Sequence, residues 1–210
     1  SVRTALGSSL NIPAVRTIQM VTPRAFRDQL YALGLSSLNQ DGDYYGFSLA
    51  LGGADVRLLE LTNAYRVLAN FGMYSSVRNI HNAPASNTKH VIDKASSFII
   101  GDVLADRNAR AATFGLENVL ATRHWSAVKT GTSKDMRDNW TIGFSRKYTV
   151  GVWVGNASGA PMWDVSGMHG AAPVWQAVMN RLHERIPTKA PPMITGVEAR
   201  NVKFEKNLEA

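Results

Sequence analysis

Three short runs of β-forming residues lie close together late in the chain, and they constrain its fold more than any other feature. The runs cover residues 126–132, 140–144 and 148–154, and each has the length of an ordinary strand. Because the last two are separated by just residues 145–147, they should form an antiparallel hairpin. A small antiparallel sheet is therefore expected in this part of the chain.

Helical patterns lie before and after these strands. Apolar residues recur there at helical spacing, with residues typical of helix ends at the boundaries. The expected helices run from Thr22 and Pro23 to Gly34, from Asp55 to Gly72, from Asp93 through Leu104, and from Ala171 to about Arg185. Helices on either side of an antiparallel sheet predict an α+β fold, an antiparallel sheet with flanking helices.

The chain is expected to hold one large unit and a tail. Residues 1–186 carry the predicted helices and strands, whereas residues 187–210 read as a linker, with adjacent prolines at 191 and 192, and the start of a truncated following segment. No run approaches the roughly 18 apolar residues that a membrane-spanning helix needs. The chain opens on Ser1 rather than Met, which suggests a mature or excised piece.

Composition excludes several classes of function. Lysine and arginine exceed acidic residues to give a net charge of +7, but they are scattered along the sequence, so no nucleic-acid partner is expected. The absence of cysteine removes disulfides, thiol catalysis and cysteine-ligated metals. No metal and no cofactor are expected.

The sharpest chemical motif is Lys129-Thr130-Gly131-Thr132, at the end of the first predicted strand. Serine acyltransferases that act on D-alanyl peptides combine such a motif with S-x-x-K and S-x-N elements. The strand edge can receive an extended peptide, and glycine lets the peptide backbone approach closely. The N–H after the glycine can point at a developing oxyanion. Alternatively, the motif is a sheet-edge strand that ends in a turn.

Two further patterns match the other elements of that set. Ser9-Leu10-Asn11 fits S-x-N, although helix capping ahead of Pro13 explains the same residues. Ser86 and Lys89 fit S-x-x-K, but they lie in a polar stretch where a nucleophile at a helix start is not expected. They also follow the S-x-N element rather than precede it. A surface turn is the better interpretation of Ser86 and Lys89.

Many segments together resemble the transpeptidase domain of class A penicillin-binding proteins. The matching residues are 8–15, 49–56, 61–65, 69–72, 127–133, 138–144, 148–155 and 170–175. The tail residues 202–205 are similar to the segment that follows this domain in the penicillin-binding protein 1C type. The resemblance implies a fold like that of serine β-lactamases and transpeptidases, incomplete at the N-terminus because the nucleophile motif is missing.

The resemblance also implies roles for individual residues. Ser9 would relay protons, and Asn11 would hold a side-chain amide of the substrate. Lys129 would supply positive potential. Thr130 and Thr132 would bind the terminal carboxylate, and the N–H of Thr132 would be an oxyanion donor. His169 is an unusual residue for its segment, and a local hydrogen bond or an exposed turn is expected for it.

The implied partners are a peptidoglycan stem peptide and β-lactams. The parent would be a D,D-transpeptidase that takes an acyl group from D-Ala-D-Ala, with a glycosyltransferase domain elsewhere, anchored at the periplasmic face of the inner membrane. The chain itself is expected to be inactive. A serine β-lactamase or carboxypeptidase, and a non-catalytic scaffold module, remain alternatives. A missing segment would expose apolar surface near residues 1–20, which predicts either self-association or local disorder there.

Overall fold

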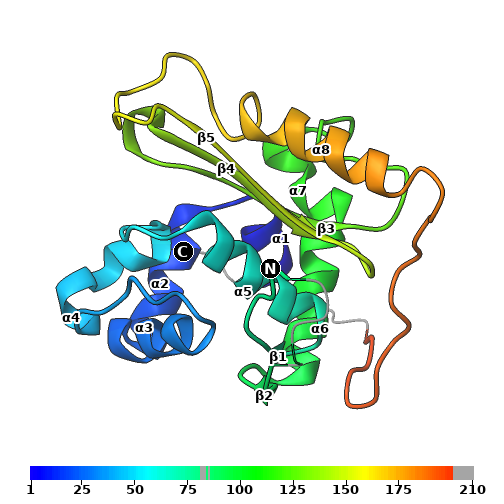
Figure 1. The fold of residues 1–210 in the computed structure, drawn as a ribbon, viewed down its shortest axis with the longest axis horizontal. Coiled ribbons are helices and arrows are strands. Elements are labelled where there is room, and N and C mark those ends of the chain that lie inside the picture. The colour runs from blue at the N-terminus through cyan, green and yellow to red at the C-terminus, as the bar shows by residue number, and fades with distance from the viewer. Residues whose placement is uncertain (81–83, 85, 201–210) are drawn as a thin grey trace, which may run out of the picture.

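The computed structural model describes residues 1–80, 84 and 86–200, and its fold is the expected α+β arrangement (Figure 1). In this part of the chain a three-stranded antiparallel sheet has the order β3-β4-β5. Its strands are β3 (Ala127–Thr132), β4 (Asp138–Phe144) and β5 (Thr149–Gly155). Ser145 N–H donates to the Tyr148 carbonyl over 2.8 Å and closes the predicted hairpin between β4 and β5.

Helices cover both faces of this sheet. In Figure 1, α8 lies above the strands while α5 and α6 lie below them, and all three contact the sheet. The helices are α1 (Val2–Gly7), α2 (Asn11–Val21), α3 (Pro23–Ala32), α4 (Gly42–Tyr45), α5 (Leu58–Ala69), α6 (Lys94–Ala105), α7 (Arg107–Phe114) and α8 (Ala171–Leu182), with 3-10 turns at Gly46–Leu51 and Lys134–Met136. A two-stranded ribbon joins β1 (Met73–Tyr74) to β2 (Lys89–His90).

Two predicted helices form where the sequence placed them. The Thr22 hydroxyl accepts from Ala25 N–H at the start of α3, and the Asp93 carboxylate accepts from Ser96 N–H at the start of α6. Two other boundaries were wrong. The helix expected from Asp55 starts at Leu58, because the backbone of Arg57 is extended, with φ −83° and ψ 138°; the Asp55 carbonyl accepts from the Ser37 hydroxyl.

The last helix ends at Leu182 instead of Arg185. His183 leaves the helical path with its ring between Ile186 O (2.6 Å) and Ser145 Oγ (2.8 Å). The following tail, residues 187–200, contains no helix or strand. It begins against the sheet unit, since Trp125 N–H donates to the carbonyl of the buried Thr188 over 3.1 Å. The segment 202–205, quoted above for its similarity to the 1C type, lies outside the described residues.

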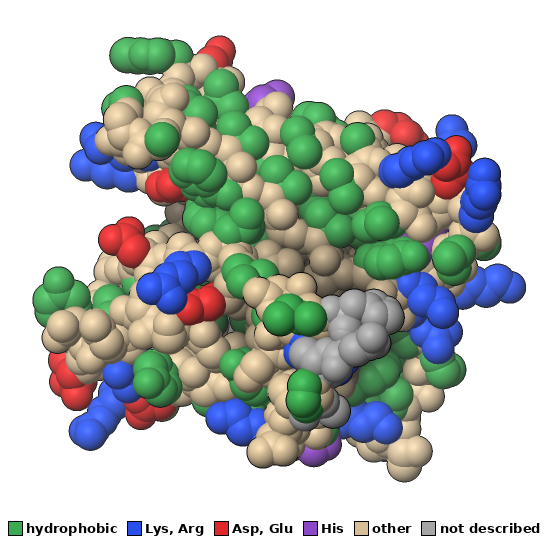
Figure 2. All heavy atoms as spheres, viewed as in Figure 1, with side chains coloured by type: hydrophobic (Ala, Val, Ile, Leu, Met, Phe, Trp, Pro, Cys, Tyr) green, Lys and Arg blue, Asp and Glu red, His purple; other side chains and the backbone are tan. Residues whose placement is uncertain are grey.

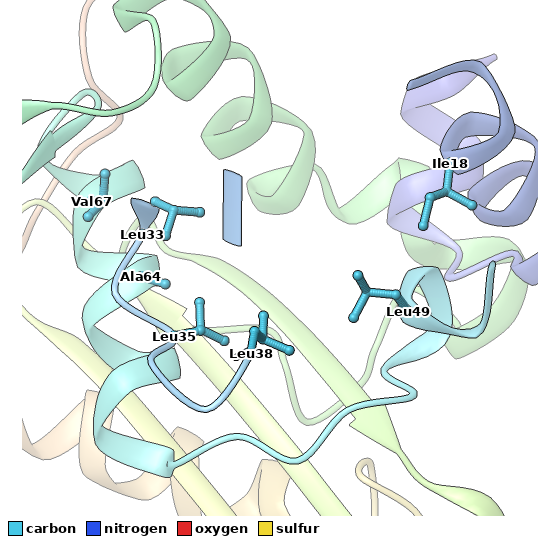
Figure 3. Packing of buried hydrophobic residues seen from close by; sticks show 7 residues of the cluster. All are labelled: Ile18, Leu33, Leu35, Leu38, Leu49, Ala64 and Val67. Carbon is cyan, nitrogen blue, oxygen red and sulfur yellow. The ribbon is translucent and has the colours of Figure 1, made fainter. Parts of the chain in front are cut away.

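Separate apolar clusters hold the helical and sheet regions. The helical cluster joins α2, α3, α5 and the loops between them (Figure 3), through Ile18, Leu33, Leu35, Leu38, Leu49, Ala64 and Val67. In the sheet region, Trp175 of α8 is fully buried against β3 and β5. A Cβ at Gly143 would lie 2.5 Å from the Trp175 ring and 2.6 Å from the Ala127 carbonyl. Glycine at that position therefore lets α8 pack directly on the sheet.

Candidate active site

Lys129 of β3 and Ser9 lie together although 119 residues separate them in sequence. Lys129 Nζ donates to Ser9 Oγ over 2.6 Å and to the Thr130 carbonyl over 2.9 Å. Neither partner is a carboxylate, so nothing in this contact neutralises an ammonium charge. Burial lowers the pKa of Lys129 from 10.5 to about 8. The amine is therefore mostly protonated at pH 7, with about a tenth of it present as the neutral base.

The turn between α1 and α2 holds Ser9 in an unusual backbone conformation. Its φ of 58° lies in the left-handed region, which side chains other than glycine rarely occupy. Hydrogen bonds from Ser9 N–H to Leu6 O (3.2 Å) and from Leu10 N–H to Ala5 O (2.9 Å) hold this turn. Such strain persists where neighbouring structure enforces it, and it is frequent at functional sites.

Helix α7 supplies that enforcement. The buried Ser8 hydroxyl donates to the Ala109 carbonyl over 2.8 Å, and the Thr113 hydroxyl donates to the Ser8 carbonyl over 2.9 Å. A Cβ at Gly7 would lie 2.8 Å from the Ala109 Cβ, so α1 and α7 touch almost backbone to backbone. Ser8 and α7 were missed from the sequence, because no local pattern links them.

Asn11 is the first residue of α2, and its side chain is exposed. It stands two residues from Ser9, so the two backbones are at most about 7 Å apart. The alternative interpretation of this segment as a helix cap is wrong. The residue that caps α2 is Leu10, and no side-chain hydrogen bond forms there.

The Lys-Thr-Gly-Thr motif occupies the free edge of the sheet. Among the described strands β3 pairs with β4 alone, so its other edge is open. Lys129 and Gly131 share one face of the strand, and Thr130 and Thr132 share the other. A Cβ at Gly131 would meet its nearest neighbour, Trp140, at an ordinary 3.4 Å. Within the described chain, packing therefore does not require glycine at position 131.

A loop before α8 closes over the end of the motif. Gly167 N–H donates to the Thr132 hydroxyl over 3.0 Å, and the Thr141 hydroxyl donates to the Gly167 carbonyl over 3.2 Å. The Thr132 hydroxyl accepts this bond, so its own proton stays free for an anion. His169 Nδ1 lies 3.0 Å from Ser166 Oγ, the local hydrogen bond expected for this residue.

A second network fixes the turn from β3 to β4. The Ser133 hydroxyl donates to the Asp138 carboxylate over 2.9 Å, and the Trp153 indole donates to the same carboxylate over 2.9 Å. Asp135 and Met136 between them have φ of 58° and 55°. The end of the motif strand is thus held on both sides, by this turn and by the Gly167 loop.

The S-x-x-K pair formed by Ser86 and Lys89 makes no site comparable to that of Ser9 and Lys129. Ser86 lies outside any helix and donates to the Ser76 carbonyl over 3.4 Å. Lys89 belongs to β2, and its Nζ lies 5.5 Å from the centre of the Tyr74 ring. Ser86 is half-buried in an irregular segment, so the surface turn interpreted from the sequence stays a prediction. In the described part of the chain, no group of three or more acidic or histidine side chains is arranged to hold a metal.

The surface of the molecule is hollowed between its two lobes and partly apolar. Figure 2 shows a notch between the part of the molecule that carries the sheet and the helical lobe below it.

Residues 2–21 are mostly helical, so the expected local disorder there was wrong. Exposed apolar side chains do lie in these helices, with Val2 81%, Ile12 72% and Met20 84% exposed. Among the described residues, every helix is too short or too polar to span a bilayer.

Comparison with known proteins gives consistent relatives. No family model matches the chain. The chain is 32% identical over 185 residues to penicillin-binding protein 1C of Escherichia coli (strain K12), covering 88% of this chain and 23% of that protein. It is 30% identical over 210 residues to penicillin-binding protein 1A of Aquifex aeolicus (strain VF5), covering 91% and 27%. The chain thus spans about a quarter of the length of these relatives.

The fold has a solved counterpart. The crystal structure of penicillin-binding protein 1A from Haemophilus influenzae matches 92% of this chain and 36% of its own, with a TM-score of 0.74 at 20% identity. Sequence similarity over most of the chain and agreement in fold lead to the same group of proteins. The chain belongs to the penicillin-binding proteins, and in sequence it is more similar to the 1C relative than to the 1A relatives named here.

Proposed function

We propose that this chain forms two of the three catalytic elements of a peptidoglycan D,D-transpeptidase. The observation that supports the proposal is the 2.6 Å contact between Lys129 Nζ and Ser9 Oγ at an open strand edge. In the intact parent, a nucleophilic serine attacks the carbonyl between two D-alanines and releases the terminal D-alanine. An amine of a neighbouring strand then takes the acyl group. Because the relatives are penicillin-binding proteins, the similarity favours this function over a serine β-lactamase or a carboxypeptidase.

Each site residue has a proposed task that follows from its position. Ser9 passes the proton of the attacking serine to the leaving amine, and its bond to Lys129 keeps its hydroxyl oriented. Lys129 supplies either positive potential or an acceptor for that proton, since burial lowers its pKa to about 8. Asn11 holds the side-chain amide of the donor peptide from the start of α2.

The motif strand receives the donor peptide along its open edge. The hydroxyls of Thr130 and Thr132 bind the terminal carboxylate, and the N–H of Thr132 donates to the oxyanion. Gly131 has no packing reason to lack a side chain, which supports the close approach of a peptide backbone at this point. β-Lactams occupy the same edge as mimics of the D-Ala-D-Ala terminus.

The nucleophile is proposed to come from outside the 210 residues. Two S-x-x-K matches lie in the described part, and neither serine is at a helix start: Ser86 lies in a loop, and Ser126, three residues before Lys129, lies directly before β3.

We also propose residues 1–186 as the domain portion and 187–210 as a linker. We place the parent at the periplasmic face of the inner membrane, with a membrane anchor and a glycosyltransferase domain of its own. Self-association through the apolar side chains of α1 and α2 belongs to the same proposal.

Two experiments test this function. Intact-mass analysis of the 210-residue chain after incubation with penicillin should show no adduct, and a stable adduct would move the nucleophile into this chain. In the full-length parent, Lys129→Met should abolish acylation by a fluorescent penicillin, whereas Lys147→Met, which removes an exposed lysine of the β4–β5 hairpin, should leave it intact. Equal labelling of both variants would refute the proposed site.

A further inference from the structure

A cavity at the opposite end of β3 from the Gly131–Thr132 end is surrounded by cationic side chains. It has a volume of about 200 Å³ and lies between the start of β3 and the junction of α6 with α7. Three arginines line it, Arg107 and Arg110 from α7 and Arg123 from the loop before β3, together with His124. No aspartate or glutamate is among the lining residues. This site does not depend on the proposed function.

Two of these side chains are buried with nitrogen atoms left without partners. Arg110 is 4% exposed and His124 is 9% exposed. Arg110 donates one bond, to the Leu104 carbonyl at the end of α6 over 3.2 Å. Its other terminal nitrogen and Nε2 of His124 have no hydrogen-bond partner among the described residues. A guanidinium nitrogen without a hydrogen bond lowers the stability of the folded protein several times more when it is buried than when it is exposed to water.

The nearby carboxylate of Asp106 forms its hydrogen bonds with other groups and compensates the charge of this cluster only in part. Asp106 bonds to Arg3 over 3.1 Å and accepts from the N–H groups of Asn108 and Ala109. None of the ion pairs in the described part of the chain involves the three cavity arginines. Burial, followed by the charge of Arg107, lowers the pKa of Arg110, and the opposing charge of Asp106 offsets only part of this fall. Arg107 and Arg123 are exposed and form a rim that a solute can reach.

We propose that this cavity binds a tetrahedral oxyanion of the phosphate type, as a free ion or as a monoester group. Guanidinium groups that approach from different elements suit several oxygens arranged around one centre better than the two oxygens of a carboxylate. The anion would accept from the free nitrogen of Arg110 and from the two rim arginines. It would also join α7, which holds Ser8, to the strand that carries Lys129.

The test is thermal unfolding of the 210-residue chain with increasing inorganic phosphate, against sodium chloride of equal ionic strength. We expect a saturable rise in Tm of about 3 °C or more above the chloride control. Arg123→Gln should weaken the apparent phosphate affinity about tenfold, the loss of one charged hydrogen bond. Arg146→Gln, which removes an exposed arginine of the β4–β5 hairpin, should leave the affinity unchanged.

Further arms identify the ligand class and the buried contact. Methyl phosphate should act like inorganic phosphate if a monoester fits, and acetate should give a smaller rise. Arg110→Met should lose the phosphate-dependent rise, and if that variant does not fold, Arg107→Gln provides the second test. A rise no greater than that in chloride, equal affinity in the Arg123 and Arg146 variants, or tighter binding of acetate would overturn the proposal.

Discussion

Replacing Lys129 with methionine should make the protein more stable at neutral pH, although it removes a residue of the proposed site. The ammonium group is held among groups that do not balance its charge. Its contacts are the Ser9 hydroxyl and the Thr130 carbonyl. Methionine has a similar length and no charge to desolvate. The effect should therefore depend on pH in a way that identifies this single group.

The magnitude follows from the pKa of Lys129. A fall from 10.5 to about 8 corresponds to about 3 kcal/mol that the folded state loses by keeping the ammonium form. Against this, methionine gives up two hydrogen bonds worth about 1 kcal/mol each, of which water can replace part. Lys129→Met should thus be about 1–2 kcal/mol more stable than the wild type at pH 7.

The pH dependence has a definite sign. Below about pH 8 the amine is protonated in the folded and unfolded states, and the full penalty is present. Between 8 and 10.5 the unfolded chain binds more protons than the folded one, so wild-type stability rises with pH. By pH 10 the wild type should have regained about 2.5 kcal/mol relative to Lys129→Met.

Urea unfolding of both proteins between pH 6 and pH 10 measures this difference, with Lys147→Met as the control for an exposed lysine. The control should follow the wild type at every pH. A Lys129→Met variant that is less stable than the wild type at pH 7, with a difference that does not change up to pH 10, would refute the reasoning.

Three further outcomes follow from packing and titration. Gly131→Ala should change the free energy of unfolding by no more than about 0.5 kcal/mol but abolish β-lactam acylation of the parent. In Gly143→Ala the new methyl group would meet the Trp175 ring, so urea unfolding should show a loss of about 1–3 kcal/mol in the free energy of unfolding. Gly7→Ala should cost a similar amount by forcing α1 away from α7, and a neutral result would contradict the close packing of these helices. Burial, and then a neighbouring imidazole, lowers the pKa of His124 from 6.5 to about 4. Stability should therefore be lost as pH falls through that range, and His124→Phe should flatten this loss in thermal unfolding.

The sheet and two of the helices could be predicted because their signals are local. The strands β3, β4 and β5 are runs of β-forming residues, and the last two are joined by a short link. Thr22 and Asp93 cap their helices as their side chains suggest. The start of α5 could not be predicted in the same way. Arg57 is extended before the helix, and the Asp55 carbonyl accepts from Ser37, a residue of another loop that no pattern around Asp55 reveals.

The site likewise has features that the local sequence predicts and features that depend on contacts between distant residues. Lys129 and Gly131 stand out in sequence because their motif is specific, and Ser9 gains meaning from the resemblance. The 2.6 Å contact between Lys129 and Ser9 and the φ of 58° at Ser9 depend on α7, which buries Ser8. The cavity around Arg110 is likewise a product of the fold, because its arginines resemble the other scattered positive charges in the sequence.

Heteronuclear NMR titration of the lysine side chains tests the central arrangement most directly. The account predicts one lysine with a pKa near 8, absent from the spectrum of Lys129→Met and displaced in Ser9→Ala. A spectrum in which no signal with a pKa near 8 is lost in Lys129→Met would show that Lys129 is solvated and not enclosed beside Ser9.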